Sequence, residues 1–176
     1  MTRVLSGVAL ALGALALIWF LTSIALLGVA LIVVAIAFHE YDRIVDKIGV
    51  KVPYWTTLVA TLLVCAMVPF QYVDLESVLA LALLIIALNV LASSRVGAPV
   101  LADSAAAMLA PVYIGVPMGC LVGVHAMVGR EGVLLLIATV AVSDSAQFYT
   151  GRTIGRTPLA PLRSPKKTRE APMAAS

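Results

Sequence analysis

The stretch VLSGVALALGALALIWFLTSIALLGVALIVVAIAF (residues 4–38) decides the class of fold, because it holds 35 residues and no charged side chain. As one helix it would be about 52 Å long, whereas the hydrocarbon core of a membrane, about 30 Å thick, needs about 20 residues. Two joined helices fit better, turning near residues 19–23 with Trp19 and Phe20 at a membrane interface. Because the run exceeds the length of a secretory signal, we predict an uncleaved membrane hairpin.

The composition of the whole chain agrees with a membrane protein. Of its 176 residues, 62% are hydrophobic and 12% are charged, and the mean hydropathy is +1.07. Soluble domains contain roughly 45–50% apolar and 25% charged residues, so a water-soluble globule and a disordered chain are both excluded. Cys65 and Cys120 lie inside apolar runs, which argues against a secreted disulfide framework or a zinc site.

Four further apolar segments predict four more membrane-spanning helices. The six predicted spans cover residues 4–20, 22–38, 54–70, 77–92, 105–128 and 132–148. We therefore expect an all-α, polytopic integral membrane protein. Its transmembrane helical domain would cover residues 1–150, and a basic cytoplasmic segment without a core of its own would cover residues 151–176.

Small residues and prolines predict how the fifth span packs. Gly115, Gly119 and Gly123 recur every four residues, which places them on one helix face where another backbone can approach closely. Pro111 and Pro117 are expected to kink the same helix.

The distribution of positive charge predicts the orientation of the chain, because cytoplasmic loops are enriched in Lys and Arg. With the N-terminus inside, eleven of the 12 Lys and Arg residues lie on the cytoplasmic side, and Arg130 alone lies outside. We expect both termini in the cytoplasm. The net charge of +3 then reflects topology and a basic tail, and no nucleic-acid partner is expected.

A carboxylate in the last predicted span is the first candidate for chemistry. Asp144 lies about 18 Å along the helix from Gly132, within bilayer depth, where an ionisable group costs about 2.5–3.5 kcal/mol. It therefore needs a partner, a metal or a water-filled cavity, unless it is hydrated at the helix end. The flanking hydroxyls of Ser143 and Ser145 make an oxygen-rich group that suits Mg²⁺.

The basic segment that follows is the second candidate. Its stretches GRTIGR (151–156) and SPKKT (164–168) combine small and hydroxylated residues with Lys and Arg, a composition that suits polyphosphate binding. A topology signal or a patch for anionic lipids is the alternative. The carboxylate 20 residues before Ser164, predicted at the same membrane face, favours the functional interpretation.

The two candidates together resemble a known family. SDSAQFYTGRTIGR (143–156), then LAP (159–161) and SPKKTRE (164–170), are similar to motifs of the phosphatidate cytidylyltransferases, also called CDP-diacylglycerol synthases. In that family a pattern resembling S-D-T-x-A-Y-x-x-G-R-x-F-G-K precedes L-x-P-x-x-S-P-K-K-T-W-E-G. Arg3 before the first helix and Glu40-Tyr41 after the second resemble the family's N-terminal hairpin.

The sequence also departs from the family pattern. Ser145 stands for Thr, Gln147 lies near the usual Tyr, Arg156 stands for Lys and Arg169 for Trp. After Glu170 the similarity stops, and a C-terminal signature resembling K-D…H-G-G-x-x-D-R-x-D does not follow. We interpret the chain as the N-terminal part of such an enzyme, and expect little or no activity from it alone.

The resemblance implies a reaction in which a phosphate oxygen of phosphatidate attacks the α-phosphorus of CTP, giving CDP-diacylglycerol and pyrophosphate. Asp144 would be the Mg²⁺ ligand and, with Lys167, the catalytic pair. The implied substrate-binding residues are Ser143, Arg152, Ser164, Lys166, Lys167 and Thr168. CTP, phosphatidate and membrane lipids are the implied partners, a homodimer is left open, and the bacterial inner membrane is the expected location.

Two alternatives belong to other classes of protein. A CTP-dependent membrane lipid kinase of the polyprenol type would transfer the γ-phosphate, and a non-catalytic membrane protein would transfer nothing. Other polar residues are interpreted as structural: His39 and Glu40 at the interface, His125 packed or hydrated, and Asp103 and Asn89 in interhelical hydrogen bonds.

Overall fold

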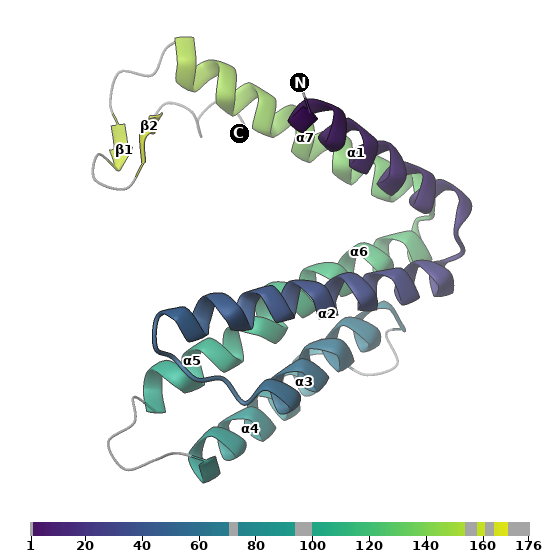
Figure 1. Ribbon diagram of the computed structural model, residues 1–176. Coiled ribbons are helices and arrows are strands. Elements are labelled where there is room, and N and C mark those ends of the chain that lie inside the picture. Colours follow the sequence, from purple (N-terminus) through teal and green to yellow (C-terminus); the bar gives the residue numbers. More distant parts are fainter. Residues whose placement is uncertain (1, 71–73, 94–99, 154–157, 161–163, 169–176) are drawn as a thin grey trace. The chain divides into compact units, whose positions relative to one another are not determined.

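The computed structural model describes residues 2–70, 74–93, 100–153, 158–160 and 164–168 (Figure 1). Within these ranges, the side chains of residues 2–6, 8–11, 93, 151–153, 158–160 and 164–168 are not described. The chain divides into two compact units, Met1–Arg130 and Glu131–Ser176.

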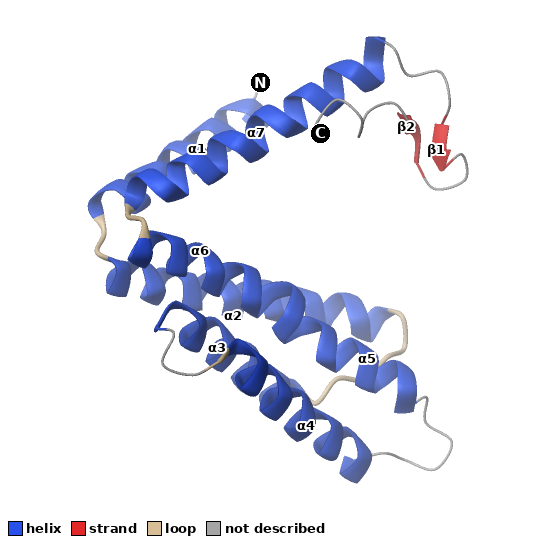
Figure 2. Ribbon diagram, turned by 180° about the vertical axis from the view of Figure 1, so that it is seen from behind, coloured by secondary structure: helices blue, strands red, loops and turns tan. Residues whose placement is uncertain are grey.

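Helices make up nearly all of the described structure, as Figure 2 shows in blue. The first unit contains α1 (Thr2–Phe20), α2 (Ser23–Lys47), α3 (Tyr54–Met67), the 3₁₀ turn η1 (Val68–Phe70), α4 (Leu75–Ser93), α5 (Val100–Ala110), the π-helical segment η2 (Pro111–Gly115) and α6 (Val116–Met127). The second unit contains α7 (Arg130–Thr153), which begins at the boundary residue, and the strands β1 (Pro158–Ala160) and β2 (Ser164–Thr168).

The predicted turn of the N-terminal hairpin is confirmed at residues 21–22, between α1 and α2. Thr22 is the N-cap of α2, and its Oγ1 accepts a hydrogen bond from the backbone N–H of Ala25 (3.4 Å). Such a cap satisfies a donor that the first turn of a helix leaves free. The side chain therefore fixes the start of α2.

α3 lies between two apolar clusters that form the core of the first unit. It packs against α2, α4 and α6. One cluster joins α3 to α4 and α5 through residues such as Val64, Ile86 and Ala107. The other joins α3 to α2 and α6 and includes Val34 and Val122.

The predicted small-residue face of the fifth span packs against α3. A Cβ atom added at Gly115 would lie 2.8 Å from the carbonyl oxygen of Thr61, and one added at Gly119 would lie 2.9 Å from the carbonyl oxygen of Cys65. Real Cβ atoms do not approach backbone so closely, so only glycine allows these two helices to come so near each other. The interpretation of this face as a packing surface is confirmed.

Pro111 marks a change of helical register. Proline has no N–H to donate to the carbonyl four residues earlier, here that of Ala107. The chain adopts a π-helical segment from Pro111 to Gly115, which ends where the N–H of Val116 bonds to the carbonyl of Pro111. One residue before Ala107, the carbonyl of Ala106 accepts a hydrogen bond from the Tyr41 hydroxyl (2.7 Å).

Four described helices are long and apolar enough to cross a membrane: Ser23–Lys47, Leu75–Ala92, Val100–Met127 and Arg130–Thr150. They match four of the predicted spans. The span predicted at 54–70 corresponds to a shorter apolar helix, Tyr54–Phe70. The span predicted at 4–20 corresponds to α1, half of whose side chains lie outside the described residues. The chain is therefore a helical membrane protein by composition and helix length, and six spans stay a prediction.

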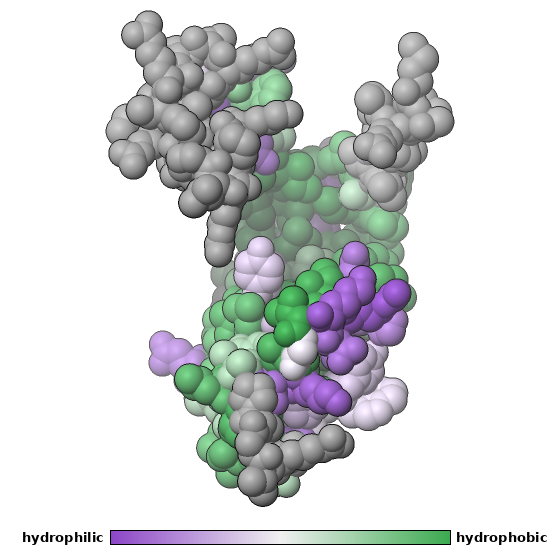
Figure 3. Space-filling view, turned by 60° about the vertical axis from the view of Figure 1, so that its left-hand side comes forward, coloured by the Kyte–Doolittle hydropathy of each residue, from purple (hydrophilic) through white to green (hydrophobic). Residues whose placement is uncertain are grey.

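The surface agrees with a membrane environment. Large apolar side chains such as Ile24, Ile36, Leu84 and Leu135 are more than half exposed. Figure 3 shows apolar (green) side chains over much of the surface in view, with the largest group of hydrophilic (purple) side chains in one region. A bilayer solvates such apolar surface without the penalty that water imposes.

The described chain is almost entirely helical, as predicted for an all-α protein, and the short strands β1 and β2 add an antiparallel hairpin in the basic segment, with Pro158 opposite Thr168 and Ala160 opposite Ser164. Proline excludes a regular helix here and restricts the preceding residue to extended conformations. Pro158 begins β1, and Pro165 lies in a strand that has a single neighbour, positions where a sheet tolerates proline.

Candidate functional site

α7 positions the first group of candidate residues. The helix begins with Arg130 and Glu131, continues through the apolar run VLLLIATVAV (133–142) and ends at Thr153. Its 24 residues span about 36 Å, more than a hydrocarbon core requires. The acidic residue in the first turn stabilises the positive end of the helix dipole.

Asp144 is an exposed carboxylate on this helix. It lies inside the candidate span Arg130–Thr150, and α7 continues for nine residues beyond it. Asp144 therefore does not lie in the last turn of α7, and the choice between a hydrated group and a metal ligand stays a prediction. In the described part of the chain, no group of three or more His, Cys, Asp or Glu side chains comes together as a metal site.

Whether Mg²⁺ can bind at Asp144 depends on the ligands that the surrounding residues provide. Mg²⁺ is usually held by one or two protein carboxylates together with water and substrate phosphates, not by a complete protein cage. Asp144 provides one such carboxylate, and the half-buried Ser143 beside it provides a hydroxyl. These two residues fit the protein's share of a magnesium and triphosphate site.

Hydroxyl and amide groups on α7 bond within the helix itself. The hydroxyls of Thr139 and Ser145 donate to the carbonyls four residues earlier, those of Leu135 (2.8 Å) and Ala141 (2.7 Å). Ser143 Oγ instead accepts from Nε2 of Gln147 (3.2 Å). No role was predicted for Gln147 from the sequence, although its spacing of four residues from Ser143 places the two side chains on the same helix face.

The remaining candidates lie in the basic segment. Arg152 lies in the last turn of α7, and the other four, Ser164, Lys166, Lys167 and Thr168, all lie on β2. Their side chains are outside the described residues. The structure therefore joins Ser143 to Asp144 on one helix and gathers four residues on one strand. The meeting of these two groups in a single site stays a prediction.

Polar residues of the first unit have structural partners. His125 is 9% exposed; its Nδ1 pairs with Ser23 Oγ (3.0 Å), and its Nε2 pairs with the carbonyl of Ile18 (3.2 Å). This confirms the interpretation of His125 as a packed residue. Asp103 Oδ1 accepts from the backbone N–H of Lys51 (2.9 Å), so it bonds to a loop and not to a neighbouring helix.

Two aromatic contacts mark the ends of the helices. The guanidinium of Arg130 lies over the ring of Trp19, with Cζ 4.4 Å from the ring centroid. The cation predicted outside thus lies beside a predicted interfacial tryptophan. In the second half of α2, the ring of Phe38 lies 5.3 Å from that of Tyr54 at the start of α3, and the Tyr54 hydroxyl lies 3.5 Å from Nδ1 of His39.

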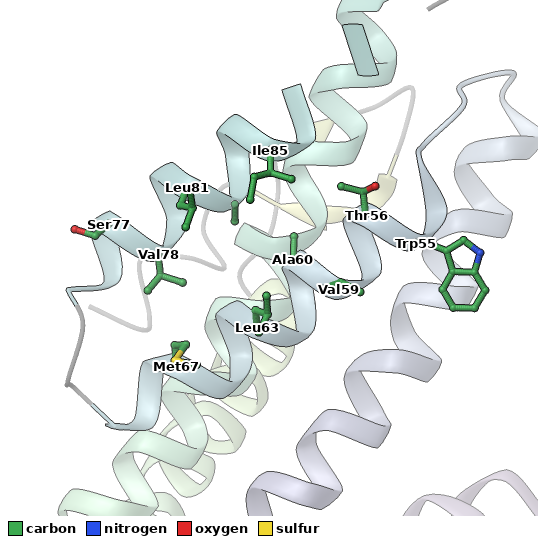
Figure 4. Close-up of a pocket in the computed structure, with 11 residues that line it drawn as sticks. Trp55, Thr56, Val59, Ala60, Leu63, Met67, Ser77, Val78, Leu81 and Ile85 are labelled. Carbon is green, nitrogen blue, oxygen red and sulfur yellow. The ribbon is translucent and has the colours of Figure 1, made fainter. Parts of the chain in front are cut away.

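An apolar groove of about 610 Å³ lies between α3 and α4 (Figure 4). Val59, Leu63, Leu81 and Ile85 line it, and none of its lining residues is charged. A nucleotide needs charged and polar contacts, which this groove does not offer. The chemistry that the sequence predicts belongs to α7 and the basic segment instead.

These features define a class of protein, a helical membrane protein that combines a carboxylate on a membrane-length helix with a following basic hairpin. The family model described as "Cytidylyltransferase family" matches residues 1–175. The chain belongs to this family, which is the family of the phosphatidate cytidylyltransferases. No curated protein and no solved structure matches the chain. Its class is therefore that of the nucleotidyltransferases that use CTP.

Proposed function

We propose that this chain takes part in the transfer of a cytidylyl group from CTP to phosphatidate, which yields CDP-diacylglycerol and pyrophosphate. The observation that carries the proposal is an exposed carboxylate, Asp144, on a membrane-length helix of a chain that belongs to the cytidylyltransferase family over residues 1–175. Phosphatidate suits such a site because its phosphate lies at the membrane surface while its acyl chains stay in the bilayer.

In the proposed reaction, a phosphate oxygen of phosphatidate forms a bond to the α-phosphorus of CTP. The bond from that phosphorus to the oxygen bridging to the β-phosphate breaks, and pyrophosphate leaves. The protein needs to position both substrates and to neutralise the negative charge on the phosphates. No covalent intermediate on the protein is required.

The chain's own residues divide these tasks. Asp144 would hold Mg²⁺, which supplies positive charge to the triphosphate when bound. Ser143 would donate a hydrogen bond to a phosphate oxygen. Lys167 would stabilise the charge that builds up on the leaving pyrophosphate, which makes it the second catalytic residue. The remaining phosphate contacts would come from Arg152, Ser164, Lys166 and Thr168.

The location follows from the same chemistry. A bacterial inner membrane with both termini in the cytoplasm would place the basic segment where CTP is available. That orientation rests on the unequal distribution of Lys and Arg, eleven on one side and Arg130 on the other, which is the usual signal for topology.

Equilibrium binding of Mg·CTP to the chain in lipid nanodiscs tests the proposal. We expect saturable binding with preference for CTP over GTP, weakened about 10-fold or more by Lys167→Ala, because a charge-assisted hydrogen bond contributes about 1.5–3 kcal/mol. Lys51→Ala is the matched control, since Lys51 lies in a loop of the first unit. Equal binding of GTP, or equal losses in both variants, would contradict the proposal.

The products distinguish the proposed reaction from the kinase alternative. Membranes that carry the chain are supplied with phosphatidate and with CTP labelled at the α- or the γ-phosphate. Label from the α-phosphate in the lipid indicates cytidylyl transfer, and label from the γ-phosphate indicates a kinase. We expect turnover by this chain alone to be low, because a single carboxylate is a weak metal site.

A further inference from the structure

Three hydroxyl side chains on α7, those of Thr139, Ser143 and Ser145, do not form the same kind of hydrogen bond. Thr139 and Ser145 each donate their proton to the carbonyl four residues earlier, which is the usual way to satisfy a hydroxyl on an apolar helix. Ser143 differs from these two residues. Its Oγ accepts a hydrogen bond from the side-chain amide of Gln147, one turn later.

The direction of this bond decides what the Ser143 hydroxyl can still do. A hydroxyl has one proton to donate and two lone pairs to accept with. Thr139 and Ser145 have used their proton on the helix backbone. Ser143 uses a lone pair, so its oxygen is fixed in place while its proton remains available beside Asp144.

An amide side chain at this position needs a reason, because Gln147 lies inside the candidate span Arg130–Thr150. A polar group in an apolar environment costs free energy unless it is hydrogen-bonded. Gln147 and Ser143 are both half-buried on α7, and their bond satisfies part of the amide. The pair thus leaves Ser143 with a proton to donate, whereas Thr139 and Ser145 have donated theirs to the backbone.

We infer that Gln147 is a positioning residue. It holds the Ser143 oxygen so that the Ser143 proton is donated to a phosphate oxygen of bound CTP. This inference rests on the proposed function. The inference adds to the proposed function a residue, Gln147, that contacts no substrate, and it gives the Ser143 hydroxyl a specific task.

A double-mutant cycle tests the inference, with Mg·CTP binding to the chain in nanodiscs as the measurement. Ser143→Ala and Gln147→Met are each expected to weaken binding about 3- to 10-fold, the effect of one hydrogen bond. The double variant is expected to bind no more weakly than Ser143→Ala, because Gln147 acts only through that serine. Thr139→Val is the matched control, and its affinity should equal that of the unchanged chain.

Gln147→Glu reverses the hydrogen bond and keeps nearly the same shape. A carboxylate can only accept, so it takes the Ser143 proton away from the nucleotide, and its charge repels phosphate. We expect a larger loss of affinity than with Gln147→Met. Both variants are compared by thermal denaturation in the same nanodiscs, since a merely structural glutamine would change stability and leave the affinity of the folded protein unchanged.

The outcomes separate the two ideas. If the unchanged chain binds CTP and Ser143→Ala weakens it, but Gln147→Met has no effect, the inference is overturned and the proposed function stands. Independent, additive losses in the double variant also overturn it. If the unchanged chain shows no preference for CTP, the proposed function fails and the inference fails with it.

Discussion

The two units of the molecule differ in how far some of their polar side chains reach along the sequence. In the first unit, His125 bonds to residues 102 and 107 positions away, and Tyr41 bonds to a carbonyl 65 positions away. On α7, the bonds of Thr139, Ser145 and Gln147 all reach four residues along the same helix. His125 and Tyr41 thus join helices of the first unit, whereas these three side chains of α7 bond only within their own helix and leave it able to receive a ligand.

This contrast predicts that changes on α7 affect binding and that changes in the first unit affect stability. The largest expected effect is on binding. Asp144→Asn should weaken Mg·CTP binding at least about 10- to 100-fold, the loss known for groups that merely support metal ligands. Thermal stability should not fall, because a neutral side chain is cheaper in a membrane than a carboxylate.

The magnesium dependence of that variant sharpens the test. Titrations with CTP in Mg²⁺ and in excess chelator should show a large difference for the unchanged chain and a small one for Asp144→Asn. An equal response to magnesium in both proteins would remove Asp144 from the metal site.

The largest expected loss of stability follows Gly119→Ala. The new Cβ would lie 2.8 Å from Cβ of Val68 and 2.9 Å from the carbonyl oxygen of Cys65, so α3 and α6 must separate, at a cost of about 1–3 kcal/mol. Gly28→Ala is the matched control. A Cβ there meets nothing within 4 Å, and alanine favours the helix by up to about 1 kcal/mol. Thermal denaturation in detergent should give a lower melting temperature for Gly119→Ala, and a higher one for Gly28→Ala, than for the unchanged protein.

A loss of stability of similar size is expected from His125→Ala. It leaves the Ser23 hydroxyl and the Ile18 carbonyl without their partner, which costs about 1–3 kcal/mol. Chemical denaturation would measure it, with the exposed His39→Ala for comparison. If both histidine variants are equally stable, the contacts of His125 do not hold the helices together.

Tyr41→Phe gives the smallest predicted effect. It removes one hydrogen bond, to the carbonyl of Ala106, and keeps the aromatic packing against Phe38. The expected loss is about 0.5–1.5 kcal/mol, again by denaturation. CTP binding should not change in this variant. A clear loss of affinity would contradict the prediction that changes in the first unit affect stability and not binding.

Much of the fold could be predicted because apolar runs and packing faces are local signals. The break between α1 and α2 and the face of Gly115 and Gly119 follow from spacing alone. The π-helical register after Pro111 could not be predicted, because it depends on how this helix packs against its neighbours. The partners of His125 were equally inaccessible, since they lie more than 100 residues away.

The candidate site was predictable in its residue types and less so in its local structure. The end of the last apolar run suggested a helix ending at Phe148, whereas backbone hydrogen bonding carries α7 on to Thr153. The basic segment was expected to have no core of its own, and no strands were predicted in it, although its prolines favour the extended conformation of β1 and β2. Which groups meet around a nucleotide depends on contacts that no short motif encodes.

The pairing of His125 with the α1–α2 turn also sets an order of events during synthesis. Ser23 leaves the ribosome 102 residues before the histidine that completes its hydrogen bond. At about 5–20 residues per second, the N-terminal hairpin exists for about 5–20 s without this partner. The turn between the first two helices must therefore persist without the hydrogen bonds of His125 until α6 is synthesised.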